Sequence, residues 1–369
     1  MADKSKQGAN FTLDPLGHIG VLGGGQLGRM LAKAAARLGY QLTIYCPEEN
    51  CPAAQVSGRH VKADYTDEAA LAAFAKSVDI VTFEFENIPV KALEICAAHA
   101  ELAPGIKSQQ VASDRLAEKQ FIEAQGIGVA PYAAFDDLDS LKAAYNAIDQ
   151  RPGIAKTRFS GYDGKGQFRV KGRRDFQGII DSLDGQKAVL EGVVDFSKEV
   201  SVMVARDRLG NVTAFAASEN THVKGMLKET VVPASISAGL DAKARVIATR
   251  LANALDHIGV LAVEMFVVDD GNNLLVNEMA PRVHNSGHWT IEGAKTSQFE
   301  QHIRAICGLP LGSGDALGKA RMVNLVGPEI LDLDAIFKDP DAHLHHYGKA
   351  DPRDGRKMGH VTWVDFSKS

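Results

Sequence analysis

The chain has 369 residues, a formal net charge of −5 and 45% hydrophobic residues. This length favours two or three packed lobes over one compact core. The acidic balance excludes a general nucleic-acid binder, and no uncharged apolar run of about 18 residues marks a membrane span. Residues 1–16 lack the apolar core of a secretory signal. We therefore expect a disordered leader there, and a cytoplasmic protein that engages neither membrane nor nucleic acid.

A first domain is expected over residues 17–112. Short apolar runs at 18–23 and 41–46 predict buried strands, and a third run at 79–85 follows a stretch at 67–76 that has helical spacing. Strand, helix and strand repeated in this way are typical of an open parallel sheet.

A glycine cluster lies between the first strand and the helix that follows it. Gly23, Gly25 and Gly28 fit the pattern GxGxxG, the helix closes on Gly39, and Glu48 lies about 20 residues further on. One interpretation is a dinucleotide site of a nicotinamide-dependent oxidoreductase. The other is a tight turn whose helix N-terminus faces a phosphate or a substrate. No obvious hydride-transfer site follows, which favours the second.

A middle lobe is expected over 113–195, and a last lobe over 196–369. The middle lobe opens with a helix at 113–125, for which Ser113 is the predicted cap. Strands and helices then alternate without the regular repeat of the first domain, so the fold class is α/β with α+β lobes. Further strands are expected at 154–158, 187–194 and within 198–236, and further helices at 137–148, 174–183 and 241–257.

A second glycine-rich segment, FSGYDGKGQ at 159–167, lies between two predicted strands. It lacks the GK-Ser/Thr ending of a Walker A loop. Its glycines, Gly161, Gly164 and Gly166, would let a hairpin tip fold backbone N–H groups over an anion, with Lys156 just before it. The favoured interpretation is a lid over a triphosphate, and the alternative is a solvated hairpin turn.

Two glutamates are expected to face each other in the last lobe. If two strands pair symmetrically about Gly271, Glu264 lies opposite Glu278. Like charges in this position repel, and burial raises a carboxyl pKa, so a bound cation would resolve the conflict. Oxygen ligands suit magnesium; the alternative is an exposed pair. The same register pairs Phe266 with Val276 and Val268 with Leu274.

Polar and basic groups follow this strand pair. NEMAPRVHNSGH contains several donors suited to phosphoryl groups and oxyanions, namely Asn277, Arg282, His284, Asn285, Ser286 and His288. The tail YGKADPRDGRKMGH carries four cations that suit a phosphate-bearing substrate, or else form a solvated basic loop: Lys349, Arg353, Arg356 and Lys357.

Cysteines and tail histidines carry no predicted site. The spacing of the four cysteines matches no CxxC pair or zinc pattern, so four reduced thiols are expected. His343, His345 and His346 are expected at the surface, because no supporting ligand pattern accompanies them.

Taken together, the motifs resemble the ATP-grasp carboxylases, most closely those that carboxylate 5-aminoimidazole ribonucleotide in purine synthesis. The resemblance covers nearly everything after the leader. It rests on GGGQLGRM, TFEFENIP, DRLAEK, KTRFSGYDGKGQ, NEMAPRVHNSGH and YGKADPRDGRKMGH.

The resemblance implies an ATP-grasp fold with a pre-ATP domain, a middle lid lobe and a C-terminal mixed-sheet lobe, and usually a homodimer. It implies magnesium on Glu264 and Glu278, with Arg282, His284, Asn285 and Ser286 around bicarbonate and the reacting amine. ATP would be bound by Arg115, Lys156, Gly161, Tyr162, Asp163, Gly164, Lys165, Gly166, Gln167, Glu191, Gly192, Val193, Val194, Glu199, His222, Asn277 and Glu278. The ribonucleotide would be held by Lys349 and Arg356 at its phosphate, and by Glu86, Gln26 and Leu27 elsewhere.

The chemistry implied is activation of bicarbonate by ATP to carboxyphosphate, followed by transfer of its carbon to the amine. Arg282, His284, Asn285 and Lys156 are the expected catalytic residues, and the glycine-rich loop would exclude water. Three alternatives remain: an ATP-grasp ligase with another acceptor (a glycinamide ribonucleotide transformylase or a biotin carboxylase), the oxidoreductase, and a non-catalytic nucleotide sensor.

Overall fold

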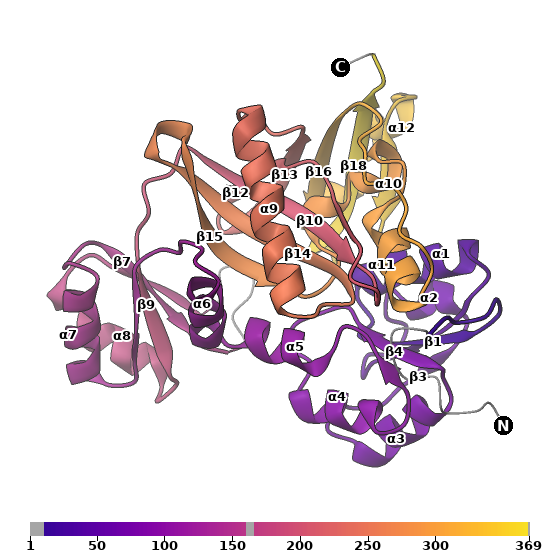
Figure 1. Cartoon of the computed structure of the whole chain (residues 1–369), viewed down its shortest axis with the longest axis horizontal. Helices are drawn as coiled ribbons and strands as arrows, with labels where there is room; N and C mark the ends of the chain where they lie inside the picture. The colour runs from indigo at the N-terminus through magenta and orange to yellow at the C-terminus, as the bar shows by residue number, and fades with distance from the viewer. Residues whose placement is uncertain (1–10, 160–165, 368–369) are drawn as a thin grey trace.

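The computed structural model describes residues 11–159 and 166–367, which form three β-sheets (Figure 1). The N-terminal sheet is parallel, in the order β3-β2-β1-β4-β5, as the alternating pattern predicts. Its strands are β1 (His18–Leu22), β2 (Gln41–Tyr45), β3 (His60–Val61), β4 (Ile80–Phe83) and β5 (Glu101–Leu102). Its helices are α1 (Gln26–Arg37), α2 (Ala54–Ser57), α3 (Glu68–Lys76), α4 (Val90–Ala97) and α5 (Ile106–Ser113).

Two local predictions for this region can be compared with the structure. Helix α1 ends at Arg37, and Gly39 follows with φ of +84°, as a glycine closing a helix does. The described part of the expected leader is packed rather than disordered: Leu13 is buried, and its N–H donates to the Cys307 carbonyl at 2.9 Å. Apolar contact with the body of the protein therefore begins before residue 16.

The middle lobe is a separate four-stranded antiparallel sheet in the order β6-β9-β7-β8. Its first helix, α6 (Arg115–Ala124), is capped by Asp114, whose carboxylate accepts from the Leu116 N–H, and not by Ser113 as expected. Ser113 instead ends α5, so the side chain one residue later is in place to cap. The other elements are β6 (Tyr132–Phe135), α7 (Leu138–Ala147), β7 (Gly153–Thr157), β8 (Gln167–Val170), α8 (Phe176–Leu183) and β9 (Ala188–Gly192).

The last lobe is built on a nine-stranded sheet whose main path is β15-β14-β10-β12-β13-β16-β18-β17, with β11 paired to β10. Helix α9 (Ala238–Ala254) packs on β10 and β14. The strands are β10 (Lys198–Arg206), β11 (Val212–Ala214), β12 (Ser218–Val223), β13 (Met226–Val232), β14 (Gly259–Val268), β15 (Asn273–Ala280), β16 (Lys319–Val326), β17 (His343–His346) and β18 (Lys357–Asp365). The remaining helices are α10 (Thr290–Gly293), α11 (Gln298–Ile306) and α12 (Asp334–Lys338).

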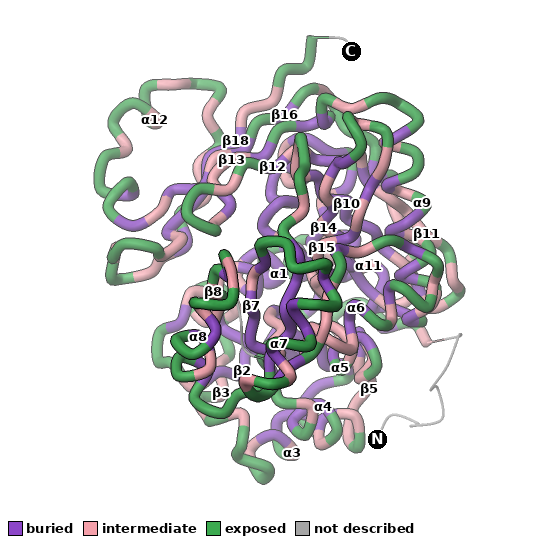
Figure 2. Tube along the Cα trace, turned by 90° about the vertical axis from the view of Figure 1, so that its left-hand side faces the viewer, coloured by how far each residue is buried: buried purple, intermediate pink, exposed green. Residues whose placement is uncertain are grey.

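One hydrophobic core joins the first domain to the last lobe. Helix α11 packs between α1 and β14, and buried side chains from both parts, such as Leu31 and Phe299, belong to one cluster. The middle lobe has its own cluster around Leu141 and Phe176. Figure 2 shows the buried residues concentrated along the strands, with exposed residues on loops and on α12. Within the described ranges, no helix is both long and apolar enough to cross a membrane.

Candidate active site

The expected carboxylate pair is present: Glu264 on β14 lies directly opposite Glu278 on β15. The symmetric register holds only at this end of the strand pair, because a bulge after Glu264 leaves Asn277 without a cross-strand partner. The bulge inserts one extra residue in β15 and shifts every later pair by one position. The expected apolar pairs are therefore wrong, and the observed pairs are Met265–Val276, Phe266–Leu275, Val267–Leu274 and Val268–Asn273.

The environment of this pair suits a cation. Burial, and then the charge of Glu278, raise the pKa of Glu264 above its ordinary value. Only 13% of the Glu264 side chain is exposed, against 41% for Glu278, which the Arg115 guanidinium approaches at 3.4 Å. His284 Nε2 lies 3.5 Å from a Glu264 oxygen. Two opposed carboxylates in a partly enclosed place fit the oxygen-rich ligand set of magnesium.

Glu118 supports this site, although its side chain was not predicted to take part. Its carboxylate accepts the Met279 N–H at 2.5 Å, which fixes the backbone next to Glu278. Burial, and then the charge of Glu278, raise the pKa of Glu118 to about 8. The only sequence signal was its place in the DRLAEK motif.

A buried cationic pair lies in the middle lobe. Lys156 Nζ and Lys119 Nζ lie 3.0 and 3.1 Å from the same Glu191 oxygen. Burial lowers the pKa of Lys156, although the Glu191 carboxylate opposes the shift. Lys119 is the cation that sequence reasoning missed. The Glu191 side chain therefore engages lysines. Of the segment that was expected to bind adenine, Gly192 ends β9, and Val193 and Val194 follow the strand.

Glu199 and His222 lie beside the carboxylate pair on neighbouring strands. His222 Nδ1 is 2.6 Å from a Glu199 oxygen. Burial lowers the pKa of His222, but the hydrogen bond to Glu199 and the nearby charge of Glu264 outweigh it, so the net shift is upward. The two residues expected at the nucleotide are thus together in the structure.

The HNSGH segment forms a turn held by Gln298, whose amide accepts from the His284 N–H at 2.9 Å and donates to the His284 carbonyl at 2.7 Å. His284 Nδ1 lies 2.9 Å from Ser286 Oγ, which in turn lies 2.8 Å from Ser201 Oγ. Asn285 is buried, and neither polar atom of its amide has a partner among the described residues. A buried amide without a protein partner is suited to a bound ligand.

Arg282, in the last lobe, contacts a residue of the first domain. Its guanidinium donates to the Glu86 carboxylate, which joins an expected bicarbonate residue to an expected ribose residue. Burial, and then the charge of Arg282, lower the pKa of His284 well below its ordinary value, so this imidazole is neutral.

A pocket of about 470 Å³ lies where the C-terminal tail meets the first domain. Lys349 and Arg356, the residues expected to bind the ribonucleotide phosphate, line it together with Gly24 and Gly25. The tail is docked by Gln55, which donates to the Gly348 carbonyl at 2.9 Å. Side chains that were not predicted there also line it: Cys51, Gln55, Tyr65 and Glu84.

Several expected residues lie elsewhere or are not described. Leu27 is buried in the hydrophobic core, and neither it nor Gln26 lines this pocket. Gly166, with φ of +67°, lies at the end of the glycine-rich segment, and Gln167 begins β8. Gly161, Tyr162, Asp163, Gly164 and Lys165 lie outside the described residues.

The glycine turn before α1 already binds a carboxyl group of the protein. The Gly25 and Gly28 N–H groups donate to the two oxygens of Glu84 at 2.7 and 3.2 Å. An ideal Cβ on Gly23 would lie 2.3 Å from Glu84 Cγ, so this position requires glycine. Because a carboxylate of the protein occupies the N–H groups that a pyrophosphate would need, the dinucleotide interpretation is wrong.

The structure can be compared with the predictions for the tail histidines and for the cysteines. His343 and His346 are exposed as expected, but His345 is not: its Nε2 lies 2.7 Å from Glu292, and its ring stacks on His360 at 4.4 Å. All four cysteines are buried, and the structure describes each of them as a free thiol.

Comparison with known proteins gives family matches over most of the chain. The matches are a ribonucleotide synthetase preATP-grasp domain over 16–113, an ATP-grasp domain over 120–299 and a phosphoribosylaminoimidazole carboxylase C-terminal domain over 320–369. The N5-carboxyaminoimidazole ribonucleotide synthase of Brucella melitensis is 49% identical over 96% of this chain and 98% of its own. That of Bacillus subtilis is 42% identical over 94% and 91%.

Solved structures of related proteins give the same family assignment. An ADP complex of an N5-carboxyaminoimidazole ribonucleotide synthetase superposes with a TM-score of 0.93, at 40% identity over 97% of this chain and 95% of that one. The synthase of Aspergillus clavatus, in complex with ADP and 5-aminoimidazole ribonucleotide, has a TM-score of 0.88 at 30% identity over 97% and 94%. The fold and the family matches are those of an ATP-grasp enzyme, an ATP-dependent ligase. More narrowly, the chain belongs to the N5-carboxyaminoimidazole ribonucleotide synthase family of purine biosynthesis.

Proposed function

We propose that this protein uses ATP and bicarbonate to carboxylate the amine of 5-aminoimidazole ribonucleotide, releasing ADP and phosphate. The observation that carries the proposal is the pocket in which Lys349 and Arg356 meet the turn at Gly24 and Gly25. Two cations that line one pocket suit the phosphate of a ribonucleotide. This pocket is the part of the molecule that would select the acceptor, since the carboxylate pair and the lysines are suited to any ATP-grasp reaction.

Bicarbonate is a poor electrophile and needs activation. One of its oxygens attacks the γ-phosphorus of ATP, the bond to the ADP oxygen breaks, and carboxyphosphate forms. Lys156 and Arg282 carry the positive charge that offsets the charge of the moving phosphoryl group. Magnesium, held by Glu264 and Glu278, would neutralise the phosphate oxygens.

The acceptor step follows in the same site. The amine attacks the carbon derived from carboxyphosphate, phosphate leaves, and the amine loses a proton. The buried amide of Asn285 offers a donor and an acceptor for bicarbonate or the carboxyl group. His284, kept neutral by burial, is positioned by Ser286 and Gln298 to hold an oxygen or a proton.

Water must be kept out, because an acyl phosphate hydrolyses. We assign this role to segment 159–167 as a lid, on the strength of its glycines and its place between β7 and β8. A cytoplasmic homodimer completes the proposal, and light scattering of the purified protein tests the dimer. A ligase with another acceptor remains the alternative, and no feature of the pocket favours it.

ADP release with ATP, magnesium and bicarbonate, measured with and without 5-aminoimidazole ribonucleotide, tests the activity. We expect strong stimulation by the ribonucleotide and incorporation of labelled bicarbonate into it. Turnover that ignores the ribonucleotide would leave the ligase chemistry intact but refute the acceptor.

A matched pair of tail variants tests the pocket. Arg356→Ala should raise the KM for the ribonucleotide by roughly 10- to 100-fold, the loss of one charge-assisted phosphate contact, with little change in the KM for ATP. Arg353→Ala is the control, because 73% of that side chain is exposed and it does not line the pocket. Equal effects of the two substitutions would refute the assignment.

A further inference from the structure

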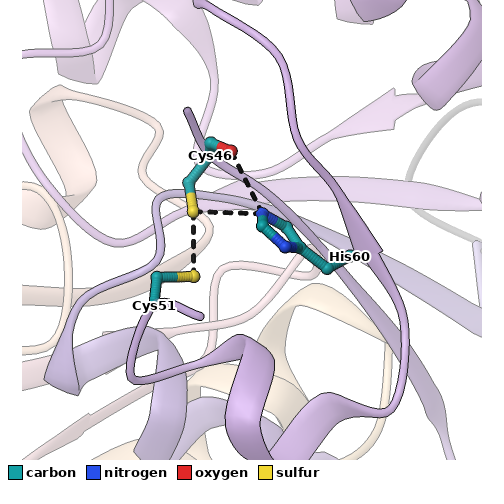
Figure 3. Close-up of side chains that lie close together, drawn as sticks. All are labelled: Cys46, Cys51 and His60. Atoms are coloured by element: carbon teal, nitrogen blue, oxygen red, sulfur yellow. Dashed lines mark hydrogen bonds between the residues drawn. The ribbon is translucent and has the colours of Figure 1, made fainter. Parts of the chain in front are cut away.

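Three soft or borderline metal-binding groups converge in the first domain, although their spacing along the chain predicts no metal site. Cys46 follows β2, Cys51 precedes α2 and His60 begins β3 (Figure 3). The two sulfurs lie 2.8 Å apart, and Cys46 Sγ lies 3.4 Å from His60 Nε2. One ligand atom from each residue lies within 4.8 Å of the other two. Neighbouring parallel strands bring these groups together.

We propose that Cys46, Cys51 and His60 form a binding site for a thiophilic divalent cation of the Zn²⁺ class. Two thiolates and one neutral imidazole are a common ligand set for zinc. Two thiolate charges balance the charge of the dication, so the occupied site is neutral and compatible with the burial of both cysteines. Magnesium, which prefers oxygen ligands, is not suited to this site.

The proposed site borders the pocket that Lys349 and Arg356 line. Cys51 lines that pocket, together with residues 47–50, which connect the two cysteines. A three-ligand site beside a solvent-accessible pocket leaves one position for water or for an oxygen of a bound molecule. The site is distinct from the carboxylate pair, which lies on β14 and β15 of the last lobe.

Binding requires small movements and the release of protons. Tetrahedral zinc with bonds of about 2.3 Å holds two sulfurs roughly 3.8 Å apart, so these sulfurs must separate by about 1 Å. Each thiol loses its proton to solvent as its sulfur binds. His60 Nε2 lies 3.1 Å from the Cys46 carbonyl, an acceptor to which only a protonated Nε2 can donate. Metal binding therefore breaks this hydrogen bond and moves the ring proton to Nδ1, so that Nε2 offers its lone pair. Burial opposes the ionisation and raises the pKa of Cys46, and the metal supplies the compensating charge.

Occupancy should affect the substrate pocket selectively. Moving the sulfurs displaces the segment between them, and this segment forms one wall of the pocket. The KM for the ribonucleotide should therefore rise when Zn²⁺ is bound. The KM for ATP should change little, because Lys156 and Glu191 lie in the middle lobe.

The test uses the reduced, full-length protein with saturating MgADP, which occupies the carboxylate site and prevents its competition for metal. Co²⁺ is added as a spectroscopic probe and Zn²⁺ as the competitor, and bound metal is counted by mass spectrometry after gel filtration. We expect about one equivalent and a thiolate-to-cobalt charge-transfer band that Zn²⁺ abolishes. Cys51→Ser should weaken binding at least tenfold, whereas Cys96→Ser, a buried cysteine of α4, should not.

Each alternative result decides against the site. No charge-transfer band in the wild-type protein refutes the proposal without reliance on any variant. Equal binding by Cys51→Ser places the metal elsewhere. Loss of two titratable thiols before metal is added, under reducing conditions, assigns a Cys46–Cys51 disulfide instead. None of these measurements depends on carboxylating activity, so the metal site and the proposed function can fail separately.

Discussion

Replacement of Glu278 by glutamine should separate stability from activity. Two carboxylates opposed across an antiparallel pair lie roughly 5 Å apart, and at an effective dielectric constant of about 20 their repulsion reaches about 3 kcal/mol when both are ionised. The substitution removes this repulsion and also the partly exposed ion pair with Arg115, which contributes about 0.2–1 kcal/mol. The metal-free variant should therefore be at least as stable as the wild type.

Activity should move in the opposite direction. Loss of one of two expected magnesium ligands removes charge stabilisation during phosphoryl transfer, for which a drop in kcat of roughly 100- to 1,000-fold is typical. MgATP should also protect the variant less against thermal unfolding. Urea unfolding without metal, together with ADP release under saturating substrates, measures both effects.

The matched control is Glu229→Gln. Glu229 lies on β13 in the same large sheet and pairs with Arg321 away from the carboxylate pair. Its kcat should stay within about twofold of the wild type, since surface pairs contribute little. Near-normal turnover of the Glu278 variant would remove the metal assignment. A loss of several kcal/mol in metal-free stability would instead show that the carboxylate is structural.

Two further predictions concern packing and capping. Gly24→Ala should destabilise the fold by about 1–3 kcal/mol in urea unfolding, because its Cβ would lie 2.4 Å from the sulfurs of Cys46 and Cys51. The control is Gly178→Ala in α8, whose Cβ would have nothing within 4 Å and which should be neutral or stabilising by up to about 1 kcal/mol. Equal effects of the two substitutions would refute the steric argument. The ion pair of Asp114 with Arg158 outweighs burial and lowers the pKa of Asp114, so its contribution is present above the unfolded pKa of 3.8 and is lost as pH falls through the folded value. Asp114→Asn keeps a capping oxygen but removes the carboxylate that titrates. From pH 5 downward, the free energy of unfolding of this variant should fall less steeply with pH than that of the wild type. An unchanged slope would refute the prediction.

Much of the local structure follows from the sequence alone. The apolar runs of β1, β2 and β4 and the amphipathic spacing of α1 are contained in single short segments, so periodicity finds them. The opposition of Glu264 and Glu278 was also predictable, because a turn at Gly271 is local information. The bulge at Asn277 was not, since an antiparallel ladder can absorb one extra residue without any mark in the hydrophobic pattern.

Which group accepts from the N–H groups of the glycine turn is decided by the tertiary fold. GxGxxG indicates a turn with free N–H groups, but the carboxylate that accepts from them belongs to Glu84, 59 residues after Gly25. β1 and β4 are neighbours in the parallel sheet, and this places Glu84, just after β4, beside the turn that follows β1. No pattern within the turn itself distinguishes an occupied site from one open to a dinucleotide.

The sequence by itself determined most elements, the class of chemistry and the opposition of Glu264 and Glu278, because each depends on residues close together in the chain. The tertiary structure decided which distant segments meet: Gln55 docks Gly348, 293 residues away, and so places Lys349 and Arg356 over the first domain. It also gathered Cys46, Cys51 and His60 from separate elements of the parallel sheet. Such contacts depend on how separate elements pack against each other, which local periodicity does not encode.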